Sequence, residues 1–211
     1  APPLCNEIVA LQSEPLSQYR SINSTAALAA PSDGFGSSVS LSQERFEGSH
    51  VALFGLPNAQ TGAGAVRIAL IRPYMQYLMV PLLSVSPADI QMRLRSPSAP
   101  LRRFGAASVI VRVGPLEYLM LIGAPAEYGS TMAGHVASVS LVQSGQDTWV
   151  LGSVADICPG LDAPAGAQYG SALTHMGYSA HSGAASFYIG APLWDSTDFR
   201  GATGQVQGLT W

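Results

Sequence analysis

Two segments of the chain gather side chains that could bind a ligand. The first, residues 193–203, combines aromatic rings, carboxylates and a guanidinium group at Trp194, Asp195, Asp198, Phe199 and Arg200. An aromatic surface beside hydrogen-bonding side chains is typical of sugar or peptide recognition. The alternative interpretation is that the two rings pack on a neighbouring element or subunit.

The second segment, residues 82–103, is basic. It holds four of the ten basic residues of the chain against one acid, Asp89, and these four are Arg93, Arg95, Arg102 and Arg103. This composition suits a cationic surface for an acidic partner or an anionic glycan. It equally suits an exposed loop, rich in Pro and Ser, that is kept soluble by its charge.

The sequence carries none of the common catalytic motifs. It has no Gly-x-Ser-x-Gly, His-Glu-x-x-His or P-loop pattern. His175 and His181 could share a metal only if the turn between them folds back, and otherwise both are exposed turn residues. Glu44 and Glu47 form either a degenerate cation site or a pair of solvated turn acids. We therefore expect no catalytic residue, no metal site and no cofactor.

The composition indicates a folded domain without a membrane span. The 211 residues are 47% hydrophobic and 11% charged, where about 25% charged residues are usual. The longest apolar runs, near residues 74–83 and 118–126, are shorter than the roughly 18 residues that a membrane helix needs. The net charge is −3 and every base is Arg, a balance that argues against bulk binding to nucleic acid.

Several features favour an extracellular or cell-surface protein. Cys5 and Cys158 stand far apart and in no Cys-x-x-Cys pair, so we expect one long-range disulfide rather than a zinc or dithiol site. The chain begins with Ala-Pro-Pro instead of Met, as it would after removal of a signal peptide. Asn23 opens a glycosylation sequon.

The chain contains a threefold internal repeat. An aromatic-Gly pair stands at Phe35-Gly36, Phe104-Gly105 and Tyr169-Gly170. An apolar run then ends in a Gly-x-Pro triplet, at Pro57, Pro125 and Pro192. A Gly-x-Val segment follows, at Gly64, Gly134 and Gly204. From Gly36 to Gly105 the period is 69 residues, and from Gly105 to Gly170 it is 65.

Each repeat is predicted to be an antiparallel meander of four strands. The runs are short, rich in β-branched and aromatic residues, and bounded by Gly and Pro, as strands are. Fourth strands are predicted near residues 74–81 and 148–154. A turn or two of helix is predicted at residues 87–94, because Ser86-Pro87-Ala88-Asp89 is a common start of a capped helix.

This series of landmarks resembles the FG-GAP repeat of the integrin α-subunit β-propeller and its extracellular relatives. The resemblance covers about residues 34–211, with Gly-Ala-Pro at 123–125 and 190–192 and Gly-Leu-Pro at 55–57. It implies an all-β fold of three propeller blades, at 34–103, 104–168 and 169–211, the last without its fourth strand. A threefold trefoil or prism is the alternative. The Asp-rich calcium loop of many such blades does not occur in this sequence.

Three blades do not close a ring, because propellers use about four to eight. We expect a partial propeller completed by a second copy or another FG-GAP chain, with a strand from residues 1–33 available to complete a blade. In the family, ligands bind loops that join second to third strands and successive blades, which adds Glu127 and Tyr128 to the candidate binding residues.

The expected function is non-catalytic recognition, adhesion or assembly outside the cell, with a protein or glycan as ligand. The alternatives are a carbohydrate-active propeller enzyme and a purely structural subunit of a larger complex or filament.

Overall fold

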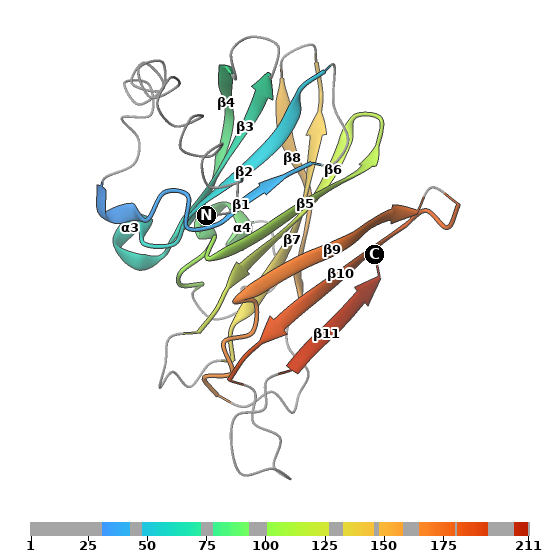
Figure 1. Ribbon diagram of the computed structural model, residues 1–211. Helices are drawn as coiled ribbons and strands as arrows, with labels where there is room; N and C mark the ends of the chain where they lie inside the picture. The colour runs from blue at the N-terminus through green and yellow to red at the C-terminus, as the bar shows by residue number, and fades with distance from the viewer. Residues whose placement is uncertain are drawn as a thin grey trace, which may run out of the picture.

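A computed structural model describes residues 31–42, 48–72, 78–92, 101–126, 133–145, 148–157, 165–179, 181–193 and 205–210. These residues form three antiparallel sheets (Figure 1). The expectation of an all-β fold is therefore confirmed. Among the described residues, no helix is long and apolar enough to cross a membrane.

Each sheet is built from strands that are consecutive in the chain. The first sheet consists of β1 (Val39–Leu41), β2 (His50–Leu56), β3 (Ala65–Arg72) and β4 (Leu78–Val85). The second consists of β5 (Ala107–Gly114), β6 (Glu117–Ala124), β7 (His135–Gln143) and β8 (Trp149–Ile157). The third consists of β9 (Ala172–Ser179), β10 (Ala184–Ala191) and β11 (Gln205–Thr210). The predicted four-stranded antiparallel meanders are thus present in the first two sheets.

The described residues also include three short helical segments. The 3-10 helix η1 (Pro31–Asp33) precedes the first sheet, and α3 (Ala59–Gly62) is a single turn between β2 and β3. The helix α4 (Pro87–Gln91) follows β4 and confirms the predicted start. The Ser86 hydroxyl accepts from the Asp89 N–H, and the Asp89 carboxylate accepts from the Ser86 N–H, which is a complete capping box.

The strand β4 departs from its sequence-based prediction. It continues through Pro81 to Val85, whereas the sequence predicts a strand near residues 74–81. Proline is tolerated here because β4 lies at the edge of the first sheet and the register shifts between Ile68 and Ala69, opposite Pro81.

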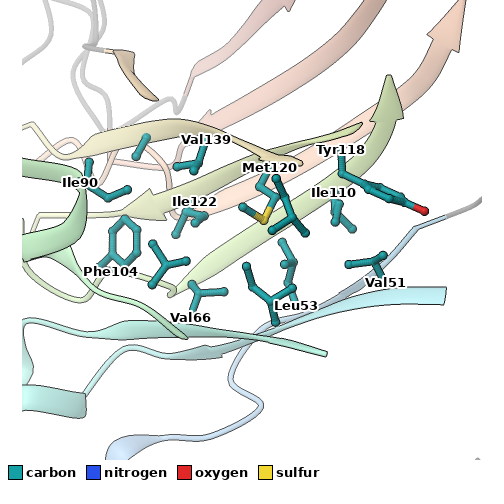
Figure 2. Packing of buried hydrophobic residues seen from close by; sticks show 14 of the residues in the cluster. Val51, Leu53, Val66, Ile90, Phe104, Ile110, Tyr118, Met120, Ile122 and Val139 are labelled. Carbon is teal, nitrogen blue, oxygen red and sulfur yellow. The ribbon is translucent and has the colours of Figure 1, made fainter. Parts of the chain in front are cut away.

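The main core lies between the first and second sheets. Figure 2 shows Val51, Leu53 and Val66 of the first sheet facing Met120 and Ile122 of the second. Ile90 of α4 and Trp149 of β8 belong to the same cluster. Burial of these side chains is the chief stabilising contribution that fixes how the two sheets pack.

A second core joins the second and third sheets. Val109 and Leu121 contribute from the second sheet, and Phe187 and Ile189 contribute from the third. The strands β1, β5 and β9 are the first strands of their sheets, and β5 contacts both of the others (Figure 1). The three sheets therefore stack in chain order, with the second sheet covered on both faces.

Candidate functional site

The three aromatic-Gly pairs form the same backbone turn at the start of each sheet. The N–H of the fourth residue donates to the carbonyl of the first, as Ser37 to Gly34 (3.0 Å), Ala106 to Arg103 (3.0 Å) and Ser171 to Gln168 (3.1 Å). The third residue is a glycine with a positive φ, of 80° at Gly36, 88° at Gly105 and 85° at Gly170. Glycine is favoured there because a side chain is strained in that conformation.

The same glycines connect two of the sequence landmarks inside each sheet. The N–H of the turn glycine donates to the first residue of the Gly-x-Pro triplet, as Gly36 to Gly55 (3.0 Å), Gly105 to Gly123 (2.9 Å) and Gly170 to Gly190 (3.1 Å). The repeat that is visible in the sequence is therefore a repeat of one hydrogen-bonded arrangement.

Two junctions join consecutive sheets, and both use the aromatic residue of the turn. The N–H of Phe104 donates to Ala63 (3.0 Å), and the N–H of Tyr169 donates to Ala133 (2.7 Å). Phe104 and Tyr169 also form parallel bridges with Gly64 and Gly134. Both rings are buried, with exposed fractions of 0% and 1%. The turn thus anchors each sheet to the one before it.

The glycine of the Gly-x-Pro triplet allows the next sheet to approach closely. A Cβ atom on Gly55 would overlap the carbonyl oxygen of Gly105. A Cβ atom on Gly123 would overlap that of Gly170. Even alanine does not fit at these two positions without a backbone shift, since the atom that it meets belongs to the main chain.

Serine side chains complete the first junction. The Ser38 hydroxyl donates to the Gly105 carbonyl (2.9 Å) and lies 3.0 Å from the Ser108 hydroxyl. The N–H of Ile110 donates to the Ser40 hydroxyl (3.2 Å). The polar side of β1 therefore faces the second sheet, where its hydroxyl groups are hydrogen-bonded as buried polar groups require.

The two ends of the stack expose the opposite sides of the first and third sheets. We call the side of a sheet toward the preceding sheet its leading face and the side toward the following sheet its trailing face. The leading face of the first sheet includes Phe35, Val39 and Leu41, with exposed fractions of 47%, 56% and 48%. The trailing face of the third sheet includes Met176, Tyr188 and Val206, with exposed fractions of 73%, 38% and 68%.

The strand register identifies the equivalent positions in the second sheet. Leu41 pairs with Ala52 as Ile110 pairs with Met120, and Ile110 is fully buried. Val206 pairs with Gly190 as Val136 pairs with Gly123, and Val136 is fully buried. Positions that are covered inside the stack are thus exposed at its ends.

The described ends of the candidate binding loops also lie together. The N–H of Arg103 donates to the carbonyl of Gly62 (2.9 Å), which joins the loop before the second sheet to the β2–β3 loop. The N–H of Leu193 donates to Ala167 (3.2 Å), which joins the loop after β10 to the one before β9. Arg102 is exposed and Arg103 is half-buried with a φ of 53°.

Most of the residues singled out from the sequence lie outside the described part of the chain. They are Cys5, Asn23, Glu44, Glu47, Arg93, Arg95, Glu127, Tyr128, Cys158, Trp194, Asp195, Asp198, Phe199 and Arg200.

No protein-family model matches the chain, and no curated protein matches it. Its function is therefore inferred from the sheets, their junctions and the exposed faces.

The histidines depart in part from their sequence-based prediction. His181 is exposed in the β9–β10 turn, but His175 is not an exposed turn residue: it lies half-buried on β9, at the position that Ile110 takes in the second sheet. Its ring packs against Phe187 with the centroids 6.5 Å apart. Burial lowers the pKa of His175 below its ordinary value. Among the described residues, no three His, Cys, Asp or Glu side chains gather as a metal site would require.

The sequence predicts that a partial propeller leaves its first and last blades uncovered, but it does not identify the side chains that face outward. The pattern that bears on these side chains is the alternation along residues 38–42, Ser-Val-Ser-Leu-Ser. It shows one apolar and one polar side, but the pattern alone does not say that the polar side is the covered one.

Proposed function

We propose that the chain is a non-catalytic extracellular module of FG-GAP type, in which the three sheets are propeller blades. It binds a protein or glycan through the loops that join second to third strands and through those that join successive sheets. The observation that carries this proposal is the pair of hydrogen bonds, Arg103 to Gly62 and Leu193 to Ala167, that tie the described ends of separate loops to one another. Loops held on a rigid scaffold in this way are the usual place for recognition residues.

The charge of these loops supports an acidic ligand. Arg102 is exposed where the chain enters the second sheet, and the sequence places Arg93 and Arg95 in the same loop. Guanidinium groups bind carboxylate and sulfate oxygens through charge-assisted hydrogen bonds. The proposal places the chain outside the cell, where a disulfide between Cys5 and Cys158 and glycosylation at Asn23 can form.

Immobilised heparin is a direct probe of the basic loop. The wild-type chain is expected to bind at low salt and to elute as salt rises, because phosphate- or sulfate-type contacts are screened by ions. The triple variant Arg93→Ala, Arg95→Ala, Arg102→Ala should elute at lower salt. The matched control is Arg72→Ala, at the far end of β3, which should elute with the wild type. A wild-type chain that passes through the column would refute binding of anionic glycans by this loop.

The aromatic loop needs a test that separates binding from packing. The double variant Trp194→Ala, Phe199→Ala should lose heparin affinity while its melting temperature stays unchanged. If the melting temperature falls and heparin affinity does not, the two rings pack on neighbouring elements and are not part of the binding surface.

A second candidate function is a structural subunit of a larger assembly. The observation that favours it is the apolar character of the two open faces, with Leu41 at 48% and Met176 at 73% exposure. Contiguous exposed apolar side chains mark interaction surfaces in folded proteins.

A further inference from the structure

We propose that the trailing face of the third sheet binds the leading face of the first sheet in a second copy of this chain. The junction would have the geometry of the two junctions that already exist inside the chain. This inference deepens the assembly role above and rests on the proposal that the sheets are propeller blades.

The leading face of the first sheet has the composition of a covered surface. In a sheet with one face open to water, polar side chains normally point outward and apolar ones inward. Here Ser38 and Ser40 point inward and are hydrogen-bonded to the second sheet, while Val39 and Leu41 point outward. Phe35 lies beside them and stacks on Phe54 with the ring centroids 5.3 Å apart. Such an arrangement is expected only where another layer covers the face.

The trailing face of the third sheet has matching positions. Tyr188 and Val206 correspond by register to Leu121 and Val136 of the second sheet, and Met176 follows Thr174 by two residues as Val111 follows Val109. The third sheet covers Val111, Leu121 and Val136. Those three have exposed fractions of 5%, 0% and 0%. The Tyr188 hydroxyl donates to the Met176 sulfur (3.2 Å), so the exposed side chains already form one cluster.

Within the described part of the chain, the backbone at both faces also lacks the neighbouring sheet that each internal junction provides. A Cβ atom on Gly55 or Gly123 would overlap the turn of the next sheet, but a Cβ atom on Gly190 would meet only Ala172 of its own sheet, at 3.2 Å. Gly190 is therefore the glycine of a Gly-x-Pro triplet for which the described residues include no following sheet.

The glycine in the turn of the first sheet differs in the same way from its two equivalents. A Cβ atom on Gly105 would lie 2.5 Å from the Ala65 carbonyl, and one on Gly170 would lie 2.6 Å from the His135 carbonyl. A Cβ atom on Gly36 would meet nothing within 4 Å. By the same register, Gly36 of a second copy fits against Gly190 and the start of β11.

The occupant is a second copy because the two faces are the two halves of one interface that the chain already builds twice. In the described structure, the front half is exposed at Val39 and Leu41 of the first sheet, and the back half is exposed at Met176 and Val206 of the third. Two copies joined head to tail use the junction twice and bring six blades, a number that propellers use. Both free surfaces are then covered without any new kind of contact.

The decisive experiment measures solution mass by light scattering across a dilution series. The wild-type chain is expected at twice its mass of 22.0 kDa. Leu41→Glu on the leading face and Met176→Glu on the trailing face should each give a monomer, since each places a charge in a dry interface. Both side chains are exposed in the single chain, so the variants should keep the wild-type circular dichroism.

Mixing the two variants tests the head-to-tail arrangement. The Leu41→Glu copy retains its trailing face and the Met176→Glu copy retains its leading face, so an equal mixture should form a dimer through one junction. A dimer that survives either single variant, or a mixture that stays monomeric, would overturn the inference. A monomeric wild-type chain would overturn it as well, and heparin binding through the loops would be unaffected by that result.

Glycine variants test the backbone fit. Gly190→Ala should abolish the dimer and leave the fold intact, while the control Gly145→Ala, in a turn away from both faces where the new Cβ atom lies 3.5 Å from Thr148, should leave the dimer intact. Gly123→Ala should destabilise the fold itself. If Gly190→Ala still dimerises, the second copy does not dock as the internal junctions do. If Gly123→Ala folds normally, the blade-like junction on which the proposal rests is wrong.

Discussion

The second and third sheets share their turns and register but differ in what covers them. In β6 every residue after Glu117 is buried, whereas in β10 buried and more exposed residues alternate. The alternation is the normal mark of a sheet with one solvated face. Yet the open positions of the third sheet still carry Met176, Tyr188 and Val206. The third sheet therefore keeps three large apolar side chains at positions that are open to solvent, beside polar residues such as Thr174.

The largest expected effect comes from adjacent residues of β10 that face opposite ways. Phe187 is 1% exposed and belongs to the core shared with the second sheet, whereas Tyr188 is 38% exposed. Phe187→Ala should lower the free energy of unfolding by about 4 kcal/mol. Tyr188→Ala should lower it by less than about 1 kcal/mol. Urea titration in the Leu41→Glu background measures both without a second copy. Equal losses would contradict the assignment of the two faces.

The second prediction compares glycines in the two sheets. Gly123→Ala forces a Cβ atom into the Gly170 carbonyl and should cost about 3 kcal/mol of unfolding free energy. Gly208→Ala is the matched control, because its Cβ atom would meet only the Tyr188 ring at 3.8 Å. Its effect should stay within about 0.5 kcal/mol. Chemical denaturation measures the unfolding free energy of both variants. A loss at Gly123 as small as that at Gly208 would mean that the second and third sheets lie farther apart than this contact implies.

The third prediction concerns the hydroxyl groups between the first and second sheets. Ser38→Ala removes the donor to the Gly105 carbonyl and the contact with the Ser108 hydroxyl. It should cost about 1 kcal/mol, the typical net contribution of a hydrogen bond. The control is Ser37→Ala, whose hydroxyl donates to Gly34 inside an exposed turn. Thermal unfolding should show a lower Tm for the first variant than for the second.

The smallest effect is a pH dependence at the junction of the second and third sheets. Desolvation holds the pKa of His175 below its ordinary value of 6.5, and its Nδ1 atom is buried without a hydrogen-bond partner. The unfolded chain therefore binds a proton that the folded chain does not, in the window from about pH 6.5 down to the lowered pKa. Stability should fall as pH drops through that window.

His175→Ile, the residue type at the equivalent position 110, should remove this share of the pH dependence. Urea midpoints measured at neutral and mildly acidic pH compare the variant with the wild type. The control is His181→Ala in the exposed turn. An unchanged slope in His175→Ile would show that His175 remains hydrated when the chain is folded.

Much of the fold could be predicted from the sequence because its landmarks are local. Gly36, Gly105 and Gly170 mark turns whose backbone only glycine adopts easily, and the apolar runs that follow have the length of strands. The start of α4 could also be predicted, because its capping residues Ser86, Pro87 and Asp89 lie within one helical turn.

The choice of covered face could not be predicted, because it depends on contacts between distant residues. The alternation in residues 38–42 groups Val39 with Leu41, but only the bonds from Ser38 and Ser40 to the second sheet show which side is inside. His175 was misplaced for a similar reason. The sequence predicts an exposed turn residue of a hairpin, while the register of His175 with Phe187 places it opposite a core residue. Most of the candidate binding residues remain a prediction, and Arg102 and Arg103 are the two that the described structure locates.

The glycine contacts between consecutive sheets have a consequence for curvature. Close to β1 and β5 the spacing between the first two sheets is set by main-chain contact at Gly55 and by small serine side chains. Near β4 and β8, which also contact each other, the core between these two sheets includes the larger side chains of Ile90 and Trp149. Because protein interiors are close-packed, this gradient in side-chain volume makes the gap a wedge. In the proposed propeller, such a wedge at each junction would rotate the next sheet in the same sense, so the volume of these side chains would set how many sheets complete a ring.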